Sequence, residues 1–174
     1  MVIERPGSHY IFIFHPDCIN KNYNYIRFQG KELTIKEYLK HWGKFVFLRP
    51  PEDLPELVEK LDYYVESGQI PCVKYDRQPL TRLDLHECVV CVYCDDREKE
   101  SVWEILKSLG VEIKAWIYEK ETMEYWLPGG RLLEKWIASH NLSAEEAEKL
   151  REDARQKFQQ MFADENAIFR GVEQ

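Results

Sequence analysis

The sequence predicts an α+β fold: a curved, mostly antiparallel sheet with helices on one face and a pair of helices at the C-terminus. Two patterns support this prediction. Short apolar segments rich in β-branched and aromatic residues alternate with segments of helical periodicity up to about residue 120. From residue 128 onward, only helical periodicity remains. A three-layer α/β domain is the alternative that the same order of elements permits.

The centre of the predicted domain is a strand–helix–strand unit over residues 87–119. The unbroken apolar run Cys88–Cys94 is typical of a strand buried on both faces. Asp95 and Asp96 then favour a turn and a helix start, and Gly110 ends the helix. Apolar and polar residues alternate from residue 111 to 119, so we expect a second strand there with one buried face.

Two helices are predicted before this unit. Thr34 and Asp53 each have a glutamate three residues later, which is the spacing of a capping box. The first helix is expected to carry Trp42 on its inner face and to end at Gly43. The second should end at Gly68. Strands are expected over residues 9–14, 25–28, 44–49 and 70–75.

The C-terminal segment predicts two helices. A short one covers residues 132–137, and a long one opens at Ser143 and reaches about residue 162. The long helix has an apolar stripe, which we expect to pack on the domain or on a second copy: Ala147, Leu150, Ala154, Phe158 and Met161. We predict a single domain over 1–174, with a mixed α+β core over 1–127 and a helical extension over 128–174. The last ten residues are expected to fray.

Composition favours a globular cytoplasmic protein. The 174 residues are 44% hydrophobic and 32% charged, and no run approaches the roughly 20 apolar residues of a membrane span. The first ten residues lack the basic-then-apolar order of a signal peptide. Five cysteines, an odd number, lie mostly in apolar runs, which favours reduced thiols over a disulfide framework. We expect no membrane contact and no cofactor.

Charge is unevenly distributed along the chain. Between Lys21 and Arg49 there are seven basic residues and two acidic ones, a net charge of +5. Because the whole chain carries −7, the remainder carries −12. The overall negative charge argues against non-specific binding of nucleic acid. The basic segment, by contrast, predicts a place for an anionic small molecule or nucleotide.

Three cysteines are spaced as C-x2-C-x2-C, a spacing that also occurs in metal sites. In an extended strand, however, Cys88 and Cys94 face one side and Cys91 faces the other. The segment also lacks the glycine-containing turns of a zinc knuckle. We therefore expect three buried thiols and no metal site.

Three segments resemble a known family in their order and pattern. They are GKFVFLRPPEDLPELVEKLDYYVESGQI, IPCVKY and ECVVCVYCDDREKESVWEILKSLGVEIKAWIYE, within residues 43–119. They resemble the uncharacterised family typified by the basophilic-leukaemia-expressed protein, whose members are sometimes labelled phosphothreonine lyase domain proteins. The resemblance implies a fold similar to that of the mRNA cap-binding initiation factor. The label implies an elimination reaction on a phosphothreonine.

Four residues have the side-chain types that such an elimination requires. Lys74, next to apolar Val73, is a candidate general base for the α-proton. Arg77 and Arg82 are candidates for holding the phosphate, and His86 for protonating the leaving group. The alternative is an outward-facing strand lysine followed by a solvated loop. The sequence leaves open whether the protein is an enzyme.

A cap-type site stacks a purine between tryptophans and holds its phosphates with arginine and lysine. Trp42, Trp116 and Trp126 are the candidates for stacking, while Trp103 and Trp136 lie on apolar helix stripes and are expected in the core. The predicted ligand-binding residues are Trp42, Lys44, Arg49, Arg77, Arg82 and Trp116. Lys44 and Arg49 bracket one strand and therefore lie about 16 Å apart, too far to grip one phosphate.

Three functions remain open from the sequence. The first is a binding module for a phosphate- or nucleotide-containing ligand on a cap-binding-like fold. The second is a phosphothreonine lyase-like enzyme. The third is a non-catalytic interaction protein that forms a homodimer through its C-terminal helix.

Overall fold

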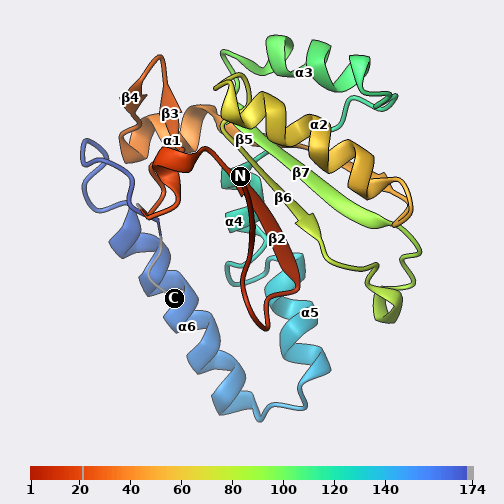
Figure 1. Cartoon of the computed structure of the whole chain (residues 1–174). Coiled ribbons are helices and arrows are strands. Elements are labelled where there is room, and N and C mark those ends of the chain that lie inside the picture. The colour runs from red at the N-terminus through yellow and green to blue at the C-terminus, as the bar shows by residue number, and fades with distance from the viewer. Residues whose placement is uncertain (21, 172–174) are drawn as a thin grey trace.

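A computed structural model describes residues 1–20 and 22–171 (Figure 1). Its main sheet has the strand order β1-β2-β6-β7-β5-β8, and every neighbouring pair is antiparallel. The strands are β1 (Val2–Glu4), β2 (Tyr10–Phe14), β5 (Trp42–Arg49), β6 (Cys72–Asp76), β7 (Cys88–Asp95) and β8 (Trp116–Tyr118). A separate hairpin consists of β3 (Arg27–Phe28) and β4 (Lys31–Glu32).

Helices α2 (Leu54–Glu66) and α3 (Lys99–Ser108) lie on one face of the sheet (Figure 1). The largest apolar core fills the space beneath them, with Leu61 and Val65 of α2, Leu106 of α3 and alternate residues of the strands. Cys88 and Cys94 belong to this core, whereas Cys91 does not. The predicted alternation of the three thiols is therefore confirmed.

The remaining helices follow a different path. Helix α1 (Ile35–His41) packs beside the hairpin, and α4 (Glu119–Glu124), α5 (Arg131–Ser139) and α6 (Ala144–Met161) lie on the other side of the sheet from α2 and α3 (Figure 1). The predicted α+β class, antiparallel sheet and C-terminal helix pair are confirmed. Among the described residues, no helix has both the length and the apolar composition needed to cross a membrane.

The end of the described chain returns to the hairpin and α1. Phe169 is buried and stacks on Tyr38 with their ring centroids 3.6 Å apart. Its amide donates to the carbonyl of Leu33 at 2.9 Å, and the amide of Ile35 donates to the carbonyl of Ala167 at 2.8 Å. The expected fraying is therefore wrong for residues 165–169, while 172–174 lie outside the described residues.

Three local expectations are corrected by the structure. Helix α1 ends at His41, so Trp42 and Gly43 belong to β5 rather than to the helix. Asp53 takes a helical conformation at the start of α2 and makes no side-chain capping bond. Only residues 116–118 of the expected strand 111–119 pair with β5, and Ile113 is 75% exposed. The alternation there predicted a strand, but most of the segment has no neighbouring strand to pair with.

Gly43 is required by the contact between β5 and β8. A Cβ atom at this position would overlap the Trp116 ring and lie 2.8 Å from the carbonyl oxygen of Ile117. We therefore expect Gly43→Ala to lower the free energy of unfolding by about 1–3 kcal/mol, the usual cost of overpacking. Urea unfolding measures this loss. Trp116→Phe should recover part of it, and an unchanged stability of Gly43→Ala would contradict the close approach.

An ion pair joins α5 to α6 and gives the stability a predictable dependence on pH. Arg151 donates to both carboxylate oxygens of Glu134, at 2.8 and 3.1 Å, and the amide of Gly129 donates to the same carboxylate. These bonds, that of Arg151 first, lower the pKa of Glu134 to about 2. Since this value lies below that of the unfolded chain, ionised Glu134 stabilises the fold above about pH 4.5. The contribution is lost as the pH falls toward 2.

We therefore expect the urea midpoints of wild type and Glu134→Gln to differ at pH 6, to approach each other below about pH 4.5 and to converge only as the pH falls to about 2. The control Glu59→Gln removes an exposed carboxylate of α2 and should show no such convergence. A constant difference between wild type and Glu134→Gln from pH 6 to 3 would contradict the assignment.

Candidate functional site

The open face of the sheet is the face that points away from α2 and α3. Since neighbouring side chains of a strand alternate, this face consists of the residues between those of the main core. Its members are Tyr10, Phe12, Phe14, Lys44, Val46, Leu48, Cys72, Lys74, Asp76, Val89, Cys91 and Tyr93. Helix α4 packs over the end near Lys44. Elsewhere the face is partly accessible, with Tyr10 40% and Leu48 43% exposed.

Lys74 lies near the middle of the open face. In the sheet register it is opposite Phe12 on one side and Cys91 on the other. Its Nζ atom lies 4.4 Å from the centroid of the Tyr10 ring, a cation–π contact. The side chain is half-buried, and within residues 1–20 and 22–171 no carboxylate forms an ion pair with it.

Lys44 flanks the other side of strand β7. Lys44 is opposite Tyr93, and Lys74 is opposite Cys91, the next residue of β7 on the same face. Unlike Lys74, Lys44 has an ion-pair partner. Its Nζ lies 2.7 Å from Oε1 of Glu119 and donates to Thr122 Oγ1 at 3.3 Å. Both contacts come from α4, so this end of the face is closed by the helix.

Two titratable groups near Lys74, the Cys91 thiol and the Tyr10 phenol, are held in their neutral forms. Burial raises the pKa of the Cys91 thiol, and Lys74 and Lys44 oppose this rise only in part. Burial, followed by the nearby Asp76 carboxylate, raises the pKa of Tyr10, while Lys44 and Arg82 lower it. A protonated thiol is a weak nucleophile, and a protonated phenol can donate a hydrogen bond. The face therefore presents cations and neutral donors, together with the buried carboxylate of Asp76, which lies 3.1 Å from His9 and accepts from the amide of Val89 at 2.9 Å.

Arg82 reaches this electrostatic environment from a loop. It belongs to the short 3-10 helix Thr81–Leu83 and influences the pKa of Tyr10. Its guanidinium is exposed, and the part of the chain that the structure describes provides no ion-pair partner for it. Lys44, Lys74 and Arg82 are thus the predicted site residues that lie around the open face.

Two of the three candidate tryptophans, Trp42 and Trp116, pack in apolar clusters away from the open face. Trp42 is 1% exposed and packs in a second apolar cluster with Tyr38 and Phe169, so a ligand cannot reach its ring in this structure. Trp116 points into the main core, where its ring lies 5.0 Å from that of Phe45. The expectation that Trp116 lies on the more exposed face of its strand is therefore wrong.

The remaining predicted residues are also separated from one another. The Arg49 guanidinium donates to the carbonyl of Gly110 at 2.8 Å, at the far end of β5. Arg77 pairs with Glu4 at 2.7 Å beside strand β1. The side chain of His86 is 83% exposed. The basic segment is dispersed as well, over the hairpin, α1 and β5, and its first residue, Lys21, lies outside the described residues.

Two aromatic residues of the open face were missed by sequence reasoning. Tyr10 and Phe12 belong to the run YIFIF, for which the sequence predicted a strand but no site residue. The available signal was the alternation of ring and aliphatic side chains, which places the rings together on one face. Their proximity to Lys74 depends on the pairing of β2 with β6, which the sequence does not reveal.

One further cluster has ligand types suited to a metal ion. Atoms of His41, Asp95 and Asp96 lie within 4.8 Å of one another. However, these groups already bind other side chains. His41 Nδ1 lies 2.8 Å from Asp96 Oδ1, and Arg97 donates to both oxygens of fully buried Asp95, at 2.9 and 2.8 Å. The cluster therefore joins the end of α1 to the turn after β7 without requiring an ion.

The Asp95–Arg97 pair should be important for stability. Replacing Asp95 by alanine removes a buried carboxylate and leaves Arg97 without these bonds, so we expect a loss of about 3 kcal/mol in the free energy of unfolding. The control Asp17→Ala removes a carboxylate whose side chain is 87% exposed and should change stability by less than about 0.5 kcal/mol. Urea unfolding compares the two variants, and equal losses would contradict a special role for Asp95.

Comparison with known proteins identified no related protein. A scan against protein-family models, a search of curated proteins and a search of solved structures each returned no match. The family resemblance over residues 43–119 therefore stays a prediction, and the function has to be argued from the side chains themselves.

Proposed function

We propose that this protein binds a small anionic ligand on the open face of its sheet, with Lys74 contacting the anionic group. The observation that carries the proposal is the half-buried ammonium of Lys74, for which the described chain supplies an aromatic ring but no carboxylate within ion-pair distance. A partly desolvated cation loses hydration without gaining a counter-ion, which is unfavourable. An anionic ligand would provide that counter-ion.

The surroundings of Lys74 favour a ligand with an apolar or aromatic part. Tyr10 and Phe12 lie on the same face, and the Tyr10 ring already contacts the ammonium group. Aromatic rings stack on bases and other flat groups, at about 1–3 kcal/mol per base. Arg82 on the adjacent loop could contact a second anionic group. A nucleotide or an aryl phosphate combines these features.

The lyase hypothesis has weaker support. It requires Lys74, Arg77, Arg82 and His86 around one phosphate. Arg77 is paired with Glu4, and the side chain of His86 is 83% exposed, 3.9 Å from Asp84 on the same loop. Lys74 alone of the four lies within the open face, so binding rather than elimination is the better proposal. The cytoplasmic location and the homodimer stay predictions.

A ligand screen by thermal shift tests the proposal, because ligands that bind only the folded state raise its melting temperature. The screen contains nucleotides, phosphoamino acids and sugar phosphates. For a ligand that binds, Lys74→Ala should weaken the affinity by about 1–3 kcal/mol, the value of a charged hydrogen bond, and Tyr10→Ala should weaken it through lost stacking. Calorimetric titration measures both.

The matched control is Lys107→Ala, which removes an exposed lysine of α3 on the opposite side of the sheet. It should leave the affinity unchanged. Equal weakening by Lys107→Ala and Lys74→Ala would indicate diffuse attraction by charge. That result, or the absence of any stabilising anion from the screen, would overturn the proposal.

A further inference from the structure

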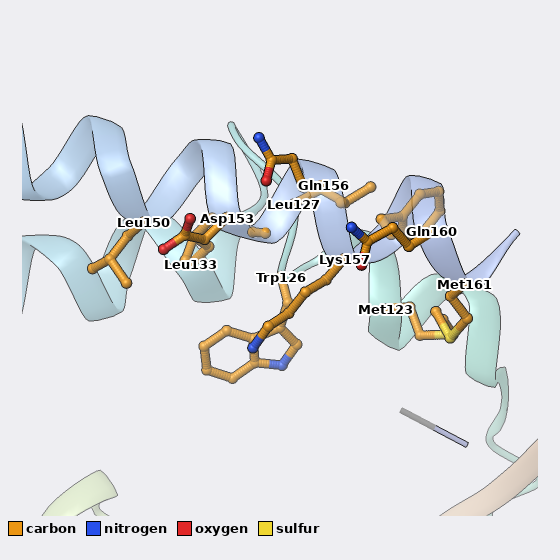
Figure 2. A pocket seen from close by; sticks show the side chains of 12 residues that line it. Met123, Trp126, Leu127, Leu133, Leu150, Asp153, Gln156, Lys157, Gln160 and Met161 are labelled. Carbon is orange, nitrogen blue, oxygen red and sulfur yellow. The ribbon is translucent and has the colours of Figure 1, made fainter. Parts of the chain in front are cut away.

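A cavity of about 560 Å³ lies between α6 and the segment that joins α4 to α5 (Figure 2). Its wall is mostly apolar and includes Met123, Trp126, Leu133, Leu150, Phe158 and Met161. These residues come from three helices and one turn. Small-molecule sites in proteins are concave, predominantly apolar and about 300–1,000 Å³ in volume. The cavity meets each of these criteria and is separate from the open face.

The cavity exists because α6 packs at two places and not between them. Toward its N-terminus, Leu150 and Ala154 join a small cluster with α5. Toward its C-terminus, Met161 joins the cluster of the hairpin and α1. Between these two places on α6 lies Phe158, and Trp126 of the α4–α5 turn also lines the cavity. Neither residue belongs to either cluster, and Trp126 is 45% exposed. The predicted apolar stripe of α6 is therefore only partly covered by the domain.

The polar groups of the cavity are on α6. Figure 2 shows Lys157 extending toward the indole of Trp126, whereas Asp153 lies beside Leu150 and Leu133. Asp153 and Lys157 are one turn apart, a spacing that often forms an ion pair. Yet none of the ion pairs found across the described ranges includes Lys157. Its ammonium is thus available at the end of the cavity where the indole is exposed.

We propose that this cavity binds an amphiphile, an apolar chain or ring system that ends in a single carboxylate. The apolar part lies between α6 and the α4–α5 turn, where it covers Trp126 and Phe158. The carboxylate pairs with the ammonium of Lys157. Asp153, at the other end of the cavity, repels a second anionic group, so the ligand carries only one anionic group.

The test uses decanoate, decanol and decyltrimethylammonium, each titrated into the protein below its micelle concentration, with tryptophan fluorescence and calorimetry as readouts. Wild type should bind decanoate more tightly than decanol, and decyltrimethylammonium least. Lys157→Gln should weaken the affinity for decanoate by about two- to fivefold, the range that an exposed ion pair supplies, and leave the affinity for decanol unchanged. The exposed Lys149→Gln on the same helix is the matched control and should alter none of these affinities.

A second variant locates the site. Ala154→Trp places a large side chain in the cavity wall and should abolish binding of both decanoate and decanol while far-UV circular dichroism remains unchanged. If that variant unfolds, Trp126→Ala is used instead. It removes an exposed side chain of the same wall and should weaken the affinity for both ligands. The proposal is overturned if decanoate does not bind, if the cationic amphiphile binds as tightly as decanoate, or if Lys149→Gln and Lys157→Gln weaken it equally.

Discussion

The pairing of β5 with β7 is the contact on which the rest of the structure depends. It runs over eight residue pairs, from Trp42 opposite Asp95 to Arg49 opposite Cys88. At one end Asp95 holds Arg97, whose guanidinium lies 3.8 Å from the centre of the Phe28 ring and so reaches the hairpin. At the other end Arg49 binds the chain after α3. The same two strands separate the main core from the open face.

The sequence predicted those features of the fold that are determined by residues close together in the chain. The capping box at Thr34 and the helix start at Ser143 are confirmed because the residues that cap each helix lie within three positions of one another. The end of α1 was predicted two residues late because Gly43 is determined by Trp116, on a strand that is remote in sequence. The short β8 and the burial of Phe169 likewise depend on neighbours that periodicity does not identify.

In the candidate site, too, only the features with a local cause could be predicted from the sequence. Lys74 was a candidate because apolar neighbours such as Val73 can desolvate its ammonium, and the structure places it, half-buried, on the open face. Its aromatic neighbour Tyr10 and the neutralisation of Lys44 by Glu119 could not be predicted, since both result from contacts between distant segments. Trp42 was misjudged for a related reason, because its cover comes from Phe169 and the hairpin.

The return of residues 165–169 to the hairpin has a consequence for synthesis on the ribosome. Tyr38 and Trp42 emerge early, but Phe169, which covers Tyr38, emerges only after more than a hundred further residues. At translation rates of 5–20 residues per second, these rings remain uncovered for on the order of ten seconds. During that interval the nascent chain displays an aromatic surface suited to chaperones. The last strand of the main sheet, β8, emerges about 50 residues before Phe169, so the sheet has all its strands before this surface is covered.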